Sequence, residues 1–191
     1  MNTIYIPVNR VRSSRRENTD IILAVLGVAV CMGLSFFLSK LWGISGQFIA
    51  AAVVSSVNRS VWESVKIMCF SMLLWFVAEF LLMHVNYYRM TAAAVVGTSA
   101  AAACRICLAF ICSGILGFSP QWLEWCLTAL SLIIGQWAAV RIQRYPGRVE
   151  EYFLWSVAGL GVLLYALLSF TVNPPHIGLF ADPVSGTYGF R

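Results

Sequence analysis

The run IILAVLGVAVCMGLSFFL, from Ile21 to Leu38, carries no charged side chain over its 18 residues. A helix rises 1.5 Å per residue, so about 20 apolar residues cross the roughly 30 Å hydrocarbon core of a bilayer. The run therefore predicts a membrane-crossing helix over about 21–41. Before it lies a polar, basic segment. Since a cleaved signal peptide has a shorter apolar region and a small-residue cleavage site, we expect this helix to be retained.

Four more apolar runs reach spanning length, over about 64–87, 91–116, 122–141 and 151–171. Hydrophobic residues make up 60% of the 191 residues and charged residues 11%, against about 25% charged in an ordinary globular domain. A water-soluble fold this poor in charge would lack a polar surface, so the lipid bilayer is the expected surrounding. The sequence predicts one all-α transmembrane bundle over 21–171, with a basic tail at 1–20 and a second tail at 172–191.

The stretch from Ile44 to Val57 is apolar but only 14 residues long, which favours a re-entrant or interfacial helix over a sixth span. With five spans, eight basic residues fall on one side: four in the N-terminal tail, Arg89, and three in the loop 141–148. A sixth span would remove this bias. The positive-inside rule therefore places the N-terminus in the cytoplasm of a bacterial cell and the C-terminus outside the plasma membrane. Because the basic residues form short clusters between apolar runs, no nucleic-acid partner is expected.

The helix expected at 91–116 is rich in small residues. Ala93, Gly97 and Ala101 recur at a spacing of four, which places them on one helix face and lets a neighbouring backbone approach closely. We expect this helix to be central in the bundle, or to contact another membrane protein or a second copy of the chain.

Glu79 and Arg105 lie well inside expected spans, where an unpaired charge is costly. Their backbone levels differ by about 9 Å at 1.5 Å per residue, so their long side chains could form an ion pair between adjacent helices. One interpretation is a structural pair that fixes helix packing. The other is a buried polar site that faces a water-filled cavity and takes a proton or an anion.

Two polar segments fall on the expected outer side. Ser60 and Glu63 have the spacing of a capping box, although Asn58 and its basic neighbours could also line an outward-facing vestibule. In the C-terminal tail, His176 and Asp182 are too few to form a metal site alone, so no metal or cofactor is expected. Aromatic residues alternate with turn signals in this tail, and we expect it to fold back onto the mouth of the bundle.

These two segments, VNRSVWESVK at 57–66 and NPPHIGLFADPVSGTYG at 173–189, resemble the two signature stretches of an uncharacterised family of small bacterial membrane proteins, a domain of unknown function. The resemblance extends over nearly the whole chain and implies a plasma-membrane location, but no activity. The family pattern has histidines where Ser64 and Asn173 stand here, which weakens any metal site in this chain.

Three functions therefore compete. The first is a permease-like or solute-binding protein that uses Glu79, Arg105 and the outer polar residues. The second is a structural or accessory subunit that packs on a partner. The third, and weakest, is a membrane enzyme built from Glu63, His176 and Asp182. A water-filled cavity at Glu79 and Arg105 would favour the first, dry internal pairs the second, and convergence of the last three residues the third.

Overall fold

The computed structural model describes residues 8–46, 49–83, 86–116, 120–182 and 186. Over these residues the chain contains helices and no strand, which confirms the expected all-α bundle. The elements, in order, are α1 (Val8–Ile44), α2 (Ile49–Val54), α3 (Val61–Met83), α4 (Tyr87–Leu116), α5 (Gln121–Gln143), a 3-10 turn η1 (Val149–Tyr152) and α6 (Phe153–Val172).

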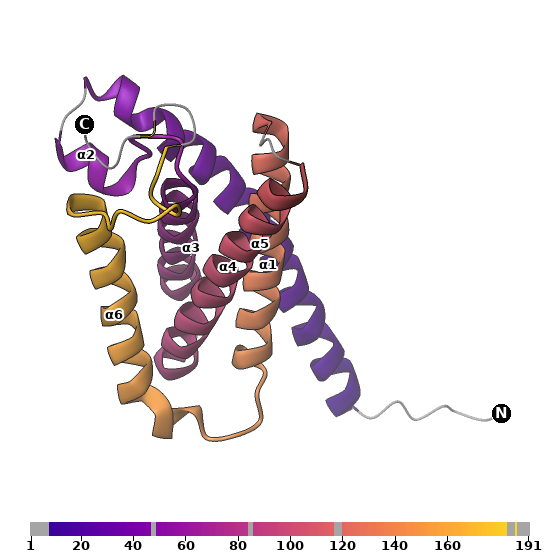
Figure 1. Ribbon diagram of the computed structural model, residues 1–191. Coiled ribbons are helices and arrows are strands. Elements are labelled where there is room, and N and C mark those ends of the chain that lie inside the picture. Colours follow the sequence, from indigo (N-terminus) through magenta and orange to yellow (C-terminus); the bar gives the residue numbers. More distant parts are fainter. Residues whose placement is uncertain (1–7, 47–48, 84–85, 117–119, 183–185, 187–191) are drawn as a thin grey trace.

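Five of the described helices are long and apolar enough to cross a membrane: Thr19–Ile44 within α1, then α3, α4 up to Ile115, α5, and Val149–Val172. They run alternately up and down between two ends of the bundle (Figure 1). We call these the Glu63 end, which holds α2 and the start of α3, and the Arg89 end, which holds the starts of α4 and α6. The short helix α2 lies at the Glu63 end and has only six residues, which is far too few to span.

α4 and α5 form the closest helix pair in the bundle, and glycines make this possible. A Cβ added to Gly135 would lie 2.8 Å from both the Gly97 carbonyl oxygen and the Ala101 Cβ. Such distances leave no room for a side chain at either glycine, so the two backbones touch. The small residues expected to make a tight contact do so within the chain, because Ala93, Gly97 and Ala101 are all buried.

At the Arg89 end, the guanidinium of Arg89 bonds the end of α5 and the loop that follows it. Arg89 donates from Nη1 to the carbonyl oxygens of Gln143 (3.1 Å) and Tyr145 (2.6 Å), and from Nη2 to that of Gly147 (3.4 Å). The last carbonyls of α5 have no partners within the helix, so a cation there is favoured. Next to it, Arg144 forms an ion pair with Asp20 of α1 at 3.0 Å. These contacts tie α1, α4 and α5 together.

Candidate functional site

The segment between α2 and α3 is shaped by its own polar side chains. Asn58 accepts the Ser60 backbone N–H on Oδ1 at 3.0 Å, an Asx turn, and Ser60 Oγ accepts the Glu63 N–H at 3.3 Å. The expected capping box is thus half present. Its other half is absent because the Glu63 carboxylate bonds the Val57 N–H at 2.9 Å, one turn further back. The Glu63 carboxylate therefore points back toward the segment that joins α2 to α3.

Glu63 makes a buried ion pair with Lys66, at 2.8 Å from Nζ to Oε2. Lys66 is fully buried and also donates to the Ala52 carbonyl of α2 at 2.9 Å. Two buried charges are tolerated when they pair and their remaining hydrogen-bonding groups are satisfied. Here the pair and its backbone partners join α2, the 55–60 segment and α3 into one unit.

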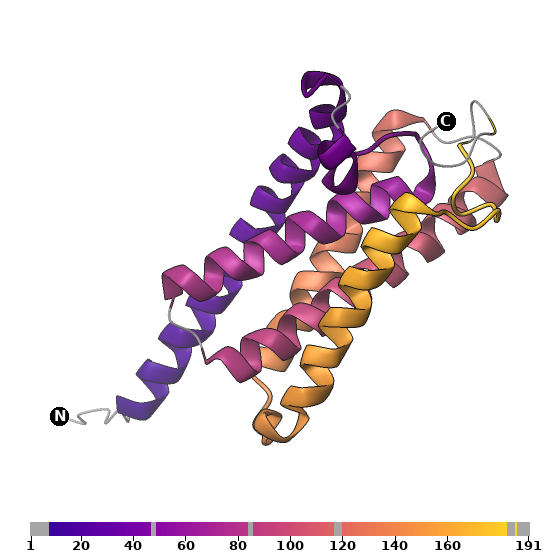
Figure 2. The same ribbon diagram turned by 90° about the vertical axis from the view of Figure 1, so that its left-hand side faces the viewer.

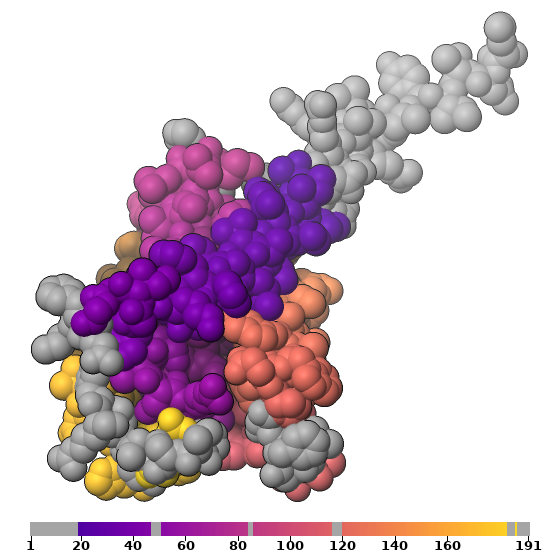
Figure 3. All heavy atoms as spheres, turned by 90° about the horizontal axis from the view of Figure 1, so that it is seen from above, coloured from indigo at the N-terminus to yellow at the C-terminus, as the bar shows by residue number. Residues whose placement is uncertain are grey.

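The C-terminal segment docks on this unit. The Trp62 N–H donates to the Leu179 carbonyl at 3.1 Å, and the Arg59 N–H donates to Asp182 Oδ2 at 3.5 Å. Phe180 is buried, with its ring 5.1 Å from that of Trp62 and 5.5 Å from that of Phe170. Seen from the Glu63 end, the yellow C-terminal segment lies beside the purple residues of this region (Figure 3). Two segments that are about 115 residues apart in the sequence thus form one polar and aromatic cluster. Residues 183–185 and 187–189 of the second segment lie outside the described part of the chain.

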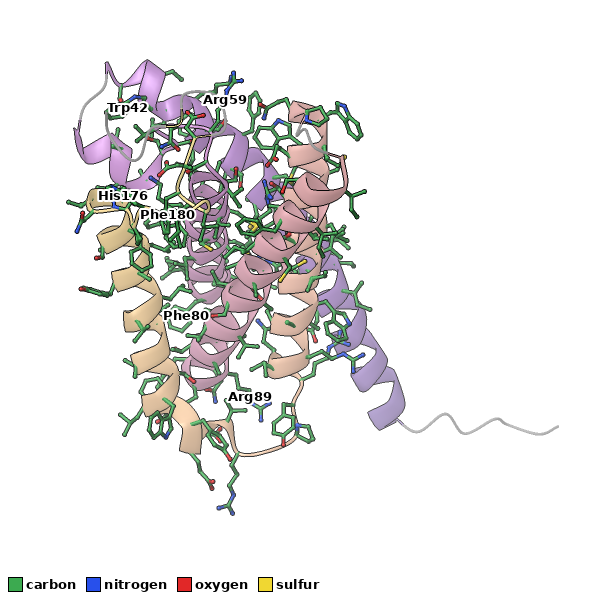
Figure 4. The ribbon with its side chains drawn as sticks, in the orientation of Figure 1. Trp42, Arg59, Phe80, Arg89, His176 and Phe180 are labelled. Carbon is green, nitrogen blue, oxygen red and sulfur yellow. The ribbon has the colours of Figure 1, made fainter. Side chains whose placement is uncertain are left out.

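Two of the three residues of the enzyme interpretation take part in joining these segments. Glu63 is buried against Lys66, and Asp182 accepts a backbone N–H. His176 is exposed at the top of α6 (Figure 4). Among the described residues, no three His, Cys, Asp or Glu side chains are grouped so as to hold a metal ion.

The two charged residues inside the spans have separate partners. Arg105 is fully buried and forms an ion pair with Glu124, near the start of α5. Glu79, near the far end of α3, accepts a hydrogen bond from Gln143 Nε2 at 3.3 Å. The expected Glu79–Arg105 pair is not formed, because the tight α4–α5 contact turns Arg105 toward α5. The sequence does not indicate that Glu124 is the partner, because Glu124 is in the first turn of α5, where a carboxylate is ordinarily solvated.

A second polar region lies among α1, α3 and α5. Ser35 Oγ donates to Ser71 Oγ at 3.0 Å, and Cys31 Sγ donates to the Ser71 carbonyl at 3.5 Å. One turn after Ser71 on α3, the Trp75 indole N–H is buried and has no hydrogen-bond partner within the described chain. Gln136 Nε2 on α5 is likewise buried without a partner. Buried donors without acceptors are costly, and among the described residues Arg105 Nε and Nη1, Thr98 Oγ1 and the Trp62 indole N–H are also buried without a partner.

A groove lies between α3, α4 and α6, with a volume of about 370 Å³. Its wall is almost wholly apolar. The residues that define it are Leu73, Phe80, Met90, Ala94, Leu160 and Leu164. Phe80 lies on the side of α3 that faces α6 (Figure 4). The groove is thus an apolar hollow between three helices of spanning length.

Comparison with protein families gives one match. A model described as a family of unknown function, DUF6512, matches residues 12–190. The chain belongs to this family. The expected resemblance to an uncharacterised family is confirmed, and DUF6512 brings no activity with it. Neither a curated protein nor a solved structure matches the chain.

Proposed function

We propose that this DUF6512 member is a non-catalytic accessory protein of the bacterial plasma membrane, with its Arg89 end in the cytoplasm, and that it packs on another membrane protein through α6. The observation that supports this proposal is a difference in how much of each helix is buried by the rest of the chain. In the segment Val149–Val172, which contains α6, only 11% of the most apolar stretch is buried within the chain, whereas the corresponding share for α3 is 56%. At the same time, Arg105 and Lys66, which are the two fully buried cations among the residues whose burial is described, are both paired with carboxylates of the same chain.

The outward face of α6 has the features of a helix-packing surface. Leu154 and Tyr165 are 80% and 71% exposed, and Ala158 and Gly161 lie exposed between them on the same side. A Cβ added to Gly161 would meet no atom within 4 Å, so packing inside the chain does not require a glycine there. Small residues flanked by large apolar ones allow the backbone of a second helix to approach closely in a membrane.

Paired glycine variants test this proposal. Gly161→Leu fills the exposed face of α6, and Gly33→Leu makes the same change on α1, at a glycine that is also exposed with no atom within 4 Å of its Cβ. With a photo-crosslinking residue in place of Tyr165, we expect a discrete protein adduct in native membranes that Gly161→Leu abolishes and Gly33→Leu keeps. Adducts to lipid alone, or equal loss in both variants, would contradict the proposal.

A permease-like role is the second candidate, and the interior polar groups of α1, α3 and α5 favour it. Buried polar side chains in spans often mark the path of an ion or proton. Packing there is tight, however, since a Cβ on Gly27 would lie 2.6 Å from Trp75 Nε1 and 2.9 Å from Gln136 Nε2. If this candidate holds, proteoliposomes that contain the chain will conduct protons or a small solute, and Gln136→Leu will stop that flux. No flux above empty vesicles would exclude it in favour of the accessory role.

A further inference from the structure

α3 and α6 approach each other at one end and separate toward the other. At the Glu63 end, Trp62 of α3 and Phe170 of α6 are in ring contact at 5.3 Å. Toward the Arg89 end the two helices diverge, and the start of α4 lies between them (Figure 2). The resulting wedge is the groove of about 370 Å³, with α4 as its floor. On the α3 side, Leu74 and Val77 are more than half exposed, so the groove opens to the membrane.

The lining residues that carry polar side chains lie at one end of the groove. Its polar lining residues, Tyr87 and Thr91, belong to the first turns of α4, at the Arg89 end. From there the groove rises along apolar residues to Phe70 of α3. Phe70 is 13 residues from the end of α3 at Met83, which corresponds to about 20 Å of helix. The groove therefore begins at one membrane interface and reaches past the bilayer midplane.

The size of the groove decides what can occupy it. The groove offers about 370 Å³, which lies within the range of sites for a single small molecule. An extended hydrocarbon chain is much thinner than a helix and would cover walls that otherwise lose dispersion contacts.

We propose that the groove binds one acyl chain of a phospholipid from the leaflet at the Arg89 end. The chain lies along α3 with its terminal methyl near Phe70, and the ester region lies near Tyr87 and Thr91. The match rests on three properties of the groove: an apolar wall, polar groups at the interface end only, and continuity with the hydrocarbon of the bilayer. It does not depend on which protein packs on the outward face of α6.

Depth-dependent photolabelling of the wild-type protein tests the orientation. The protein is reconstituted in vesicles of phosphatidylethanolamine and phosphatidylglycerol that contain a trace of phospholipid with a diazirine in one acyl chain. A diazirine near the terminal methyl should label the part of α3 around Phe70 and Leu73. A diazirine near the ester should label the start of α4 instead. Equal labelling of the other exposed helices at the same depths would overturn the proposal, because the lipid shell around the whole bundle gives that result without a bound chain.

A matched pair of variants tests the site itself. Leu164→Trp narrows the groove, whereas Leu168→Trp makes the same change one turn along α6, at a residue that is 45% exposed and does not line it. We expect Leu164→Trp to reduce labelling of α3 and α4 several-fold and Leu168→Trp to leave it unchanged. Equal labelling in both variants, or crosslinks from the groove to a protein instead of lipid, would overturn the proposal.

Discussion

The two ends of the α3–α6 pair differ in how the helices are joined. At the Glu63 end, the rings of Trp62, Phe170 and Phe180 and the backbone hydrogen bond from Trp62 to Leu179 close the gap between the helices. At the Arg89 end, the same two helices separate around an apolar groove. Inside a bilayer, apolar side chains gain little by leaving lipid for protein, so association depends on polar links and close backbone contact. α3 and α6 have such links at one end only.

This comparison assigns different roles to the polar and the apolar residues. The polar residues of the two signature segments, which a sequence alone suggests as a binding site, are used to join α2, α3 and the C-terminal segment. The surfaces that we propose bind other molecules are apolar and belong to α6 and the groove beside it. The predictions below test this division, beginning with the change expected to have the largest effect.

Removing one member of the buried ion pair should be the most damaging change. Lys66→Met leaves the Glu63 carboxylate buried without its cation and should reduce the free energy of unfolding by about 3–5 kcal/mol. Unfolding by sodium dodecyl sulfate in mild micelles measures this loss.

The double variant Glu63→Leu with Lys66→Met is its control. Replacing both charges by apolar residues is often neutral or stabilising, so most of the lost stability should return. A double variant as unstable as Lys66→Met alone would show that the pair is needed for more than neutrality.

The α4–α5 contact is expected to be next in sensitivity. Gly135→Ala places a Cβ 2.8 Å from both Ala101 Cβ and the Gly97 carbonyl oxygen, so the helices must move apart. Overpacking of this kind costs about 1–3 kcal/mol. The same substitution at Gly114, where a Cβ meets no atom within 4 Å, should change the unfolding midpoint little. Similar midpoints for the two variants would contradict the close contact.

A smaller effect is expected where the C-terminal segment docks. Phe180→Leu keeps an apolar side chain against Trp62 but loses the ring contacts, at a cost below about 1.5 kcal/mol. Its clearest readout is distance, measured by pulsed electron resonance between spin labels on α2 and on α6, which should broaden. Ile177→Ala, at an exposed residue of the same segment, is the control and should leave the distribution unchanged.

Sequence patterns predicted the fold better than the site, for physical reasons. The length of each apolar run predicts each span independently of the others. The number of basic residues on each side argued against a sixth span at Ile44–Val57, where the structure has only the short helix α2. Side-chain partners depend on how helices pack. Arg105 pairs with Glu124, and not with Glu79, because the glycines of α4 and α5 bring these two helices into contact. The hydropathy of a single sequence does not indicate which helices are in contact.

The Glu63 region shows the same limit at shorter range. The capping-box spacing predicted the bond between Ser60 and the Glu63 N–H. It could not predict that the Glu63 carboxylate turns to Lys66 and Val57, since that depends on α2 folding over the mouth and presenting the Ala52 carbonyl to Lys66. The groove had no sequence signal, because its lining residues are ordinary apolar residues of three spans.

The most direct test of the account removes both buried ion pairs and measures partner contact. A variant with Glu63→Leu, Lys66→Met, Arg105→Met and Glu124→Leu replaces the four charges by apolar side chains. If the charges only hold the bundle together, this variant will fold and will still give the protein adduct from a photo-crosslinking residue in place of Tyr165. A variant with a wild-type unfolding midpoint that no longer forms the adduct would contradict the account, because the charged residues would then take part in function.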